Sequence, residues 1–291
     1  MKVWIDGEIV DGSEAKVPVV DHGLLYGDGI FEGMRVYAGQ VFRISRHLDR
    51  LGYGAKSLAL DLPHTRDEIT QIVKSTVSAF GETEAYIRLI VTRGDGPLGV
   101  DPLTCPRPRL ICIVAAIRLF NDEQRATGLN MITSSLRRPG PDVVDPNVKS
   151  LNYINSVLAK LEARQRHADE ALMLAAGGYI AEAAVANVFL VHGDVLSTPP
   201  TSDGCLAGIN RAAVLELAPS LGLQPVERRL TRSDVFSADE MFLTGSGAGV
   251  IAVRSLDERK IGEGLRGPKT AIIEIAHREL AEREARAATA A

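Results

Sequence analysis

The sequence predicts a two-domain protein of mixed helices and strands (α/β, with α+β character). Three observations support this prediction. Strand-like apolar segments and segments of helical periodicity fill the N-terminal part, a second such series fills the C-terminal part, and a polar stretch separates the two. We expect a small domain over 1–117, an interdomain linker over 118–128 and a larger domain over 129–291.

The small domain is predicted to open with a β-hairpin, because KVWIDGEIV places an Asp-Gly pair between two apolar segments and Asp-Gly suits a two-residue turn with positive φ. Helices are expected where apolar residues recur every three to four positions behind a capping residue. The predicted elements are the hairpin turned at Asp6-Gly7, strands over 29–44 broken at Ala38-Gly39, a helix behind the cap candidate Ser45, a helix opened by the capping box Thr65–Glu68, and strands from Ala85 and Pro108.

The larger domain is predicted to combine a β-meander with three helices. Glycine pairs and a Gly-Asp pair punctuate its apolar segments at the spacing of strand turns. The predicted elements are a strand in GLNMITSSLRR, an amphipathic helix in NYINSVLAKLEARQRH, a meander turned at Gly177-Gly178 and Gly193-Asp194, a helix from about Asn210, and a closing helix from Pro268.

Composition excludes several classes of function. The net charge is −4 and no basic cluster is interleaved with aromatic residues, so no nucleic-acid partner is expected. The apolar run LICIVAAI is far shorter than the ~20 residues that cross a bilayer, so no membrane partner is expected either. The three cysteines lack CxxC spacing, which indicates a reducing, cytoplasmic location. The six histidines are scattered, so no metal site is predicted.

The segment GDGPLG at 94–99 matches the GxGxxG spacing of dinucleotide-binding loops. That function requires a helix whose N-terminus holds the pyrophosphate. Pro97, Pro102 and Pro106 exclude a helix there, so we interpret the segment as a tight loop between two strands.

Lys149, in PNVKSLNYINSVLAK, is the strongest candidate for chemistry. A lysine between a loop and a helix is usually a solvated surface residue. However, the chain has only 8 lysines against 25 arginines, and Pro146, Leu151 and Tyr153 suggest ordered packing around this one. Burial lowers the pKa of a lysine, which is the condition for Schiff-base chemistry.

Several motifs then resemble one family from end to end. Three segments of the chain resemble the class IV (fold type IV) pyridoxal 5′-phosphate (PLP) aminotransferases. They are KSLNY at 149–153, GYIAEAAVANVFLV at 178–191 and TPPTSDGCLAGINRAAVLELA at 198–218. Within that class, LLYGDGIFEGMRVYAGQVFRISRHLDRL and AYIRLIVTRGDGPLGVDP resemble the branched-chain amino acid aminotransferases. The resemblance implies a small N-terminal α/β domain, a larger domain with a β-barrel-like sheet, and transamination between branched-chain L-amino acids (Leu, Ile, Val) and 2-oxoglutarate.

The resemblance also implies the residues that bind PLP. Lys149 would be the catalytic Schiff-base lysine, Glu182 would contact the pyridine nitrogen, and Tyr153 would contact the phenolic oxygen. The phosphate would be held at the start of a helix and by two further side chains. Its implied ligands are Arg50, Leu206, Ile209, Asn210 and Ser246.

For the substrate, the resemblance implies that Tyr86 and the amides at Ser246-Gly247 bind the α-carboxylate and that Arg88 binds the distal carboxylate of glutamate or 2-oxoglutarate. The side-chain pocket would also require a second subunit of a homodimer, which contributes Tyr26 and Val100. Its implied lining is Tyr26, Phe31, Gly33, Leu98 and Val100.

The chain departs from the family pattern at three positions. Asn210 stands where Thr is usual, and Gly249 and Ala252 stand where Glu and Pro are usual. Alternatives therefore remain: a D-amino acid or (R)-amine transaminase, an aminodeoxychorismate lyase, or a non-catalytic ligand-binding homologue. Tyr153 after KSLN favours the branched-chain group, because the D-specific enzymes tend to have Leu there and the lyases Arg.

Overall fold

The structure is a computed structural model that describes residues 1–117 and 119–290, with the backbone alone for 288–290. The chain divides into two compact units. Unit 1 contains 1–117, 148–152 and 281–291, and unit 2 contains 118–147 and 153–280. Among the described residues, no helix is both long enough and apolar enough to cross a membrane.

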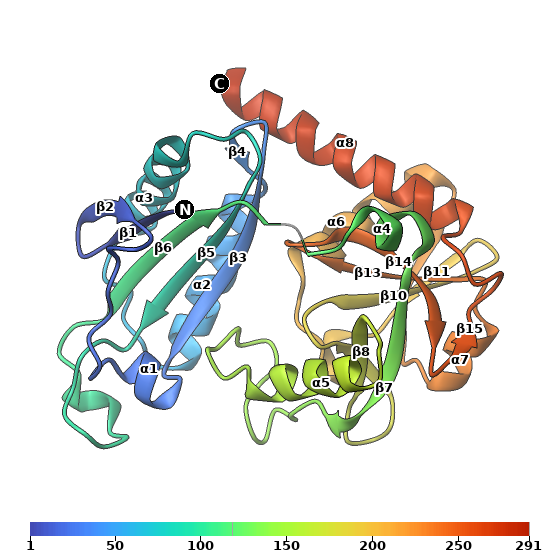
Figure 1. The fold of residues 1–291 in the computed structure, drawn as a ribbon, viewed down its shortest axis with the longest axis horizontal. Coiled ribbons are helices and arrows are strands. Elements are labelled where there is room, and N and C mark those ends of the chain that lie inside the picture. The colour runs from blue at the N-terminus through green and yellow to red at the C-terminus, as the bar shows by residue number, and fades with distance from the viewer. Residues whose placement is uncertain (118, 291) are drawn as a thin grey trace. The chain divides into compact units, whose positions relative to one another are not determined.

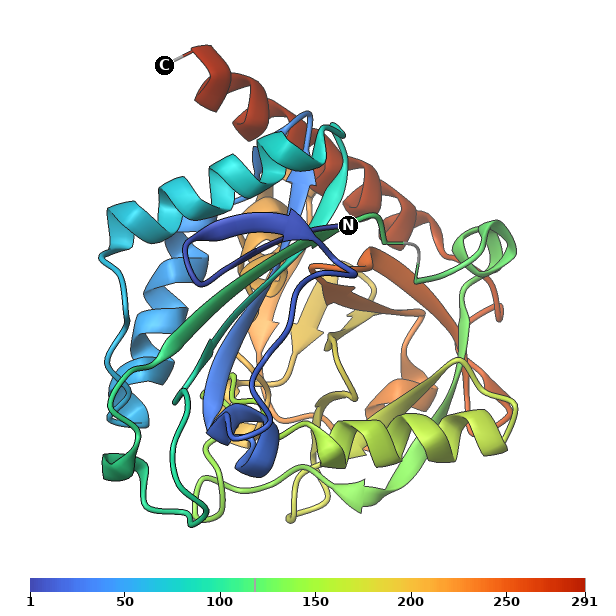
Figure 2. The same cartoon turned by 60° about the vertical axis from the view of Figure 1, so that its left-hand side comes forward.

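Unit 1 is built on a six-stranded antiparallel sheet with the order β2-β1-β6-β5-β3-β4. Helices α2 and α3 pack on this sheet (Figures 1 and 2). The elements are β1 (Lys2–Ile5), β2 (Glu8–Asp11), α1 (His22–Tyr26), β3 (Gly29–Tyr37), β4 (Gln40–Val41), α2 (Ile44–Ser57), α3 (Arg66–Phe80), β5 (Ala85–Thr92), η1 (Pro102–Thr104) and β6 (Arg109–Ala115).

The core of unit 1 lies on one face of its sheet. Alternate residues of β3, β5 and β6, such as Met34, Ile87 and Cys112, are fully buried against α2 and α3. Successive side chains on a strand point to opposite faces. The residues between these core positions therefore face the other side of the sheet, where the candidate site residues of β3 and β5 lie.

Two distant segments belong to unit 1 because of specific contacts. Residues 148–152 run beside the start of β3, where the backbone N–H of Phe31 donates to the carbonyl of Lys149 and that of Leu151 donates to the carbonyl of Gly29, both at 2.9 Å. Near the C-terminus, the guanidinium of Arg43 pairs with the carboxylate of Glu284 at 3.1 Å.

Unit 2 is built on a mixed nine-stranded sheet in which β9 follows β8 at one end and leads through 184–186 back to β10, so that the sheet curls (Figure 2). Its core joins strand residues such as Leu172 and Leu243. The elements are α4 (Asp122–Thr127), β7 (Leu129–Arg137), α5 (Ile154–Gln165), β8 (Glu170–Leu174), β9 (Ile180–Ala183), β10 (Asn187–His192), β11 (Val195–Thr198), η2 (Thr201–Asp203), α6 (Ile209–Leu217), η3 (Ala218–Leu221), β12 (Gln224–Glu227), α7 (Arg232–Ser237), β13 (Glu240–Gly245), β14 (Gly249–Leu256), β15 (Arg259–Lys260) and α8 (Pro268–Ala290).

Two details differ from the sequence prediction. Ser45 is not the cap of α2, because the helix begins one residue earlier, behind a left-handed Arg43 that makes no side-chain cap. The hydroxyl of Ser45 instead accepts a hydrogen bond from Arg66 at 2.7 Å. Residues 119–128 are not plain linker: Asn121 and Gln124 form a capping box that opens the short helix α4.

Candidate active site

In unit 1, four of the predicted substrate residues share one sheet face. Gly33 on β3 pairs with Arg88 on β5, and Phe31 and Tyr86 lie two residues away along their strands. Because side chains alternate along a strand, all four lie on the face opposite the core. A Cβ on Gly33 would come within 2.2 Å of the Tyr86 hydroxyl, so a side chain at position 33 would displace that hydroxyl.

Lys149 lies on this same face. The backbone bonds that tie 148–152 to β3 place its ammonium 4.3 Å from the centre of the Phe31 ring, within the range of a cation–π contact. Phe31 is 4% exposed, so the ring that supports the lysine is itself fixed by packing.

Arg88 is the second cation on the Phe31 ring. Its guanidinium carbon lies 4.4 Å from the ring centre of Phe31 and 5.7 Å from that of Tyr86. Among the described residues, no carboxylate forms an ion pair with Arg88. The guanidinium is therefore oriented by aromatic rings and keeps donors that suit a carboxylate ligand.

Arg50, predicted to bind phosphate, is tied to a buried carboxylate that the sequence interpretation missed. Its Nε and Nη2 donate to the two oxygens of Glu32 at 2.8 and 2.7 Å, and His47 Nδ1 donates to Glu32 at 2.7 Å. Burial by itself would raise the pKa of Glu32, but Arg50 and His47 outweigh it and lower that pKa to about 2. Burial lowers the pKa of His47, against the opposing effect of Glu32.

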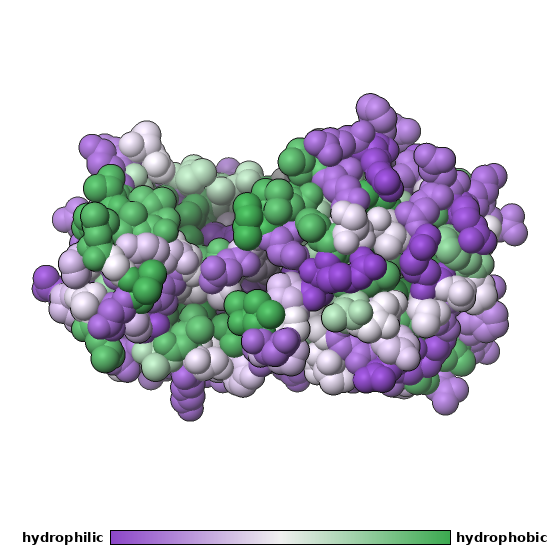
Figure 3. Space-filling model, turned by 90° about the horizontal axis from the view of Figure 1, so that it is seen from below, coloured by the Kyte–Doolittle hydropathy of each residue, from purple (hydrophilic) through white to green (hydrophobic). Residues whose placement is uncertain are grey.

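The predicted pocket residues Tyr26, Leu98 and Val100 lie on α1 and in the loop after β5, both in unit 1. The Tyr26 hydroxyl accepts a hydrogen bond from the amide of Gly99 at 2.8 Å, which holds the loop against α1. Leu98 and Val100 are about four-fifths exposed, at 81% and 78%. Figure 3 shows hydrophobic side chains, in green, gathered over part of unit 1 on the face it displays.

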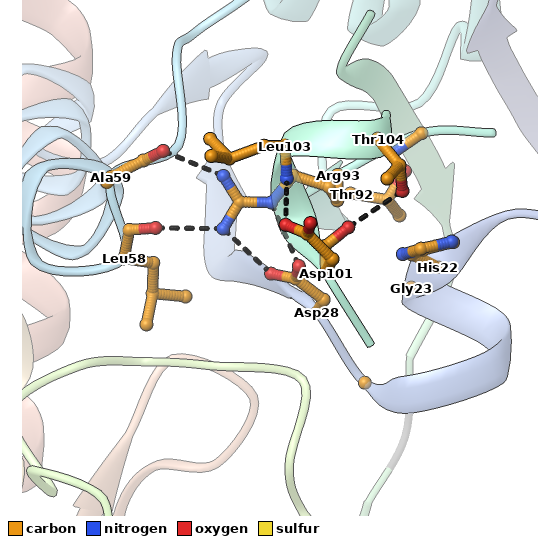
Figure 4. A network of polar contacts seen from close by, with 12 residues as sticks. His22, Gly23, Asp28, Leu58, Ala59, Thr92, Arg93, Asp101, Leu103 and Thr104 are labelled. Carbon is orange, nitrogen blue, oxygen red and sulfur yellow. Dashed lines mark hydrogen bonds and ion pairs between the residues drawn. The ribbon is translucent and has the colours of Figure 1, made fainter. Parts of the chain in front are cut away.

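The start of this loop is anchored by Arg93 (Figure 4). Arg93 is buried, with 7% of the residue exposed, and its guanidinium donates to both oxygens of Asp28 and to the carbonyls of Leu58 and Ala59, at 2.7 to 3.1 Å. No helix follows that could hold a pyrophosphate: residues 93–108, all described, contain only the three-residue turn η1. The interpretation of GDGPLG as a loop is confirmed.

In unit 2, Glu182 is 4% exposed on β9 and is held from two sides. One oxygen pairs with Arg138 at 2.5 Å, and the other accepts from the amide of Leu206 at 3.2 Å and from Asn187 at 3.3 Å. A Cβ on Gly208 would come within 2.0 Å of the Asn187 side-chain oxygen, so a side chain at 208 would displace the Asn187 amide. Sequence reasoning missed Arg138, which lies 44 positions before Glu182 in a segment without a motif.

The predicted phosphate residues of unit 2 meet at the start of α6. Gly208 caps this nine-residue helix without a side-chain hydrogen bond, so the amides of Ile209 and Asn210 keep the donor capacity that suits an anion. The side-chain amide of Asn210 donates to the hydroxyl of Ser246 at 3.3 Å. Ser246 and Gly247 lie in the three-residue loop between β13 and β14.

Four other residues of unit 2 are relevant to the predicted cofactor site. Tyr153 is half-buried at the N-terminus of α5. The hydroxyl of Thr244 is buried and has no hydrogen-bond partner among the described residues. Gly249 has a φ of +70°, which explains a glycine where the resembling family has Glu, and Ala252 is buried in β14. No group of three or more potential metal ligands occurs in the described part of the chain.

Comparisons with known proteins identify the class. Residues 29–256 match the family model of the class IV aminotransferases (Amino-transferase class IV). A Methanocaldococcus jannaschii relative, whose name provisionally assigns it branched-chain amino acid transamination, is 46% identical over 261 residues, 90% of each chain. This protein belongs to the class IV aminotransferase family.

Two solved structures specify the resemblance further. The branched-chain amino acid aminotransferase of Escherichia coli has a TM-score of 0.93 and 34% identity, covering 97% of this chain and 95% of its own. That of Thermobaculum terrenum, solved in its PLP form, has a TM-score of 0.87 and 29% identity, covering 97% of this chain and 94% of its own. The predicted fold, a small α/β domain and a larger domain with a barrel-like sheet, is confirmed.

Proposed function

We propose that this protein is a PLP-dependent transaminase that transfers amino groups between branched-chain L-amino acids and 2-oxoglutarate. The observation that carries the proposal is the face of unit 1 on which Phe31 contacts both the Lys149 ammonium and the Arg88 guanidinium. A lysine for cofactor attachment and an arginine for a carboxylate are thereby fixed on one apolar ring. The relatives with this activity in their names support the same conclusion.

The residues of unit 2 fit PLP, which when bound supplies an electron sink for the substrate's Cα–H bond. Glu182, fixed by Arg138, would keep a proton on the pyridine nitrogen. The uncapped start of α6 and the hydroxyl of Ser246 would bind the phosphate, with a favourable helix dipole. From unit 1, Lys149 would bind the cofactor aldehyde and then carry the proton between the substrate Cα and the cofactor C4′. Arg50 would contribute to phosphate binding while Glu32 fixes its orientation.

The substrate residues suit two kinds of side chain. Phe31 offers an apolar surface to leucine, isoleucine or valine, and Arg88 offers paired donors to the distal carboxylate of 2-oxoglutarate. Tyr86 would bind the α-carboxylate, together with the amides of Ser246-Gly247. One arginine among apolar groups is what an enzyme with these two partner substrates requires.

We also propose that the active form is a homodimer. The segment from Val17 to Tyr26 and the loop with Leu98, Val100 and Leu103 expose large apolar side chains on unit 1. Exposed apolar groups of this kind mark interaction surfaces. A second subunit covering them would bring Tyr26 and Val100 to its neighbour's substrate.

The test measures separate half-reactions with L-leucine, D-alanine and (R)-1-phenylethylamine through the absorbance of the bound cofactor. L-Leucine should react fastest, and Lys149→Ala should bind PLP yet convert none of the three. Faster conversion of D-alanine or the (R)-amine would replace the proposal with a D-amino acid or (R)-amine transaminase. Borohydride reduction followed by peptide mapping should label Lys149, and a label on another lysine would refute its assignment.

A further inference from the structure

Asn210 stands where the resembling family usually has threonine. Besides Ser246, its side chain has a second hydrogen-bond partner, the buried His277. The side-chain oxygen of Asn210 accepts a hydrogen bond from Nε2 of His277 at 2.8 Å, while its amide nitrogen reaches the hydroxyl of Ser246 at 3.3 Å. Asn210 is 5% exposed and His277 is 2% exposed. A line of three polar side chains thus runs from α8, through the first turn of α6, to the β13–β14 loop.

Burial makes the His277 contact informative. An imidazole inside a protein loses its hydration, and this costs free energy unless its polar atoms are paired. Ile273, one turn earlier on α8, is fully buried among Phe189, Val214 and Phe242, and the buried polar residue Thr270 is paired with Glu240. An apolar residue at 277 would be the ordinary choice for such a helix, so its histidine calls for a polar purpose.

The directions of the hydrogen bonds suggest that purpose. If Nε2 of His277 donates, the oxygen of Asn210 is fixed toward α8 and its NH₂ group is fixed toward Ser246. The Ser246 oxygen then accepts a hydrogen bond from the Asn210 amide, so its own O–H must point to a different acceptor. Hydrogen bonds in such a chain polarise and strengthen one another.

We propose that His277 is a positioning residue for the phosphate site: through Asn210 it orients the hydroxyl of Ser246 as a donor to the PLP phosphate. The proposal rests on the proposed function, because it takes Ser246 and the start of α6 as phosphate ligands. In this chain, the Asn210–His277 pair would replace the threonine that the resembling family has at position 210. His277 itself does not touch the cofactor and takes no part in proton transfer.

The test compares His277→Leu with His277→Gln, whose amide can still donate to Asn210. The measurements are the dissociation constant of PLP from the apoenzyme and the ³¹P chemical shift of bound PLP as a function of pH. His277→Leu should weaken PLP about 5- to 20-fold, the range for a buried hydrogen-bond chain that loses a partner. It should also move the ³¹P shift, and His277→Gln should restore most of both.

A matched control is Thr270→Val, also on α8, because Thr270 is fully buried but donates to Glu240 rather than to Asn210. It should lower the melting temperature without moving the ³¹P shift. A double-mutant cycle adds the variant Asn210→Thr. In the Asn210→Thr background, His277→Leu should change PLP affinity less than about twofold.

The outcomes separate the two proposals. If the wild-type protein binds no PLP, the proposed function fails. If it binds PLP but His277→Leu changes the ³¹P shift and the affinity no more than Thr270→Val does, the proposed function stands and the role of His277 is overturned. The role of His277 would also be overturned if His277→Leu weakened PLP binding equally in the wild-type background and in the Asn210→Thr background.

Discussion

Each unit buries a glutamate against an arginine, and the two carboxylates differ in their remaining contacts. Both oxygens of Glu32 accept short charge-assisted hydrogen bonds from Arg50, and His47 adds a third. Only one oxygen of Glu182 has such a partner, Arg138, and its other oxygen accepts two longer bonds from uncharged groups. An ionised carboxylate accepts about four hydrogen bonds.

This difference indicates two roles for the same residue type. The charge of Glu32 is matched by side chains of its own unit, so Glu32 serves to orient Arg50. Glu182 has one charged partner among the described residues, Arg138, so its carboxylate still attracts a second cationic group such as the protonated ring nitrogen of a cofactor. Arg88 provides the converse case in unit 1, a guanidinium oriented by rings instead of by a carboxylate.

The largest expected effect comes from Glu182→Gln. The amide conserves shape but cannot hold a proton on the pyridine nitrogen, so turnover with L-leucine should fall by about 100-fold or more, the scale of lost acid–base catalysis. The cofactor should remain bound, because the phosphate ligands are unchanged. Single-turnover kinetics with L-leucine and the PLP content of the purified variant are the measurements.

Glu32→Gln is the matched control for that experiment. It neutralises a buried carboxylate of the same size that is assigned to orientation, and its turnover should fall much less than that of Glu182→Gln. If both glutamine variants lose turnover equally, the distinction between the two glutamates is wrong.

The second expected effect concerns Arg88→Ala. A charge-assisted pair contributes roughly 1.5–3 kcal/mol, so binding of 2-oxoglutarate and glutamate should weaken about 10- to 150-fold, while leucine, isoleucine and valine are nearly spared. Each half-reaction is measured separately. Equal losses for leucine and glutamate would mean that Arg88 supports the fold of the sheet rather than recognises a carboxylate.

The fold was predictable wherever a local pattern determines it. The hairpin at Asp6-Gly7 is confirmed, with Ile5 paired to Glu8 across a left-handed two-residue turn, and so is the capping box at Thr65 and Glu68. Ser45 was wrong as a cap because the helix begins one residue earlier, at Ile44, behind the left-handed Arg43 that follows the β3–β4 hairpin. Local propensity cannot anticipate such a start.

The candidate site was predictable only in part. Resemblance proposed Phe31, Gly33, Tyr86 and Arg88, and the alternation of β3 and β5 places them on one face. Their partners were missed for different reasons. Arg138 is brought to Glu182 by the pairing of β7 with β8 and of β8 with β9, which no spacing in the sequence encodes. Glu32 and His47 carried a usable signal: a carboxylate on the core face of an apolar strand requires a cation, and His47 and Arg50 are three positions apart on a helix.

The third expected effect, on stability rather than on activity, sharpens the comparison through pH. The pKa of Glu32 is lowered from 4.5 to about 2 in the folded protein, so its carboxylate contributes stability that is fully present above about pH 4.5. That contribution is lost progressively as the pH falls toward 2, because the folded state must then take up the proton that the unfolded state has already bound. At neutral pH it is on the order of 3 kcal/mol.

Glu32→Gln has no carboxylate at this position and should therefore lose that contribution at every pH. The difference in unfolding free energy between wild type and Glu32→Gln should be constant from pH 7 to about 5 and should shrink below pH 4.5. Urea denaturation at matched ionic strength measures it. A difference that stays constant down to about pH 3 would mean that Glu32 stabilises the fold by packing, with its charge contributing nothing, and Arg50 would then not depend on Glu32 for its orientation.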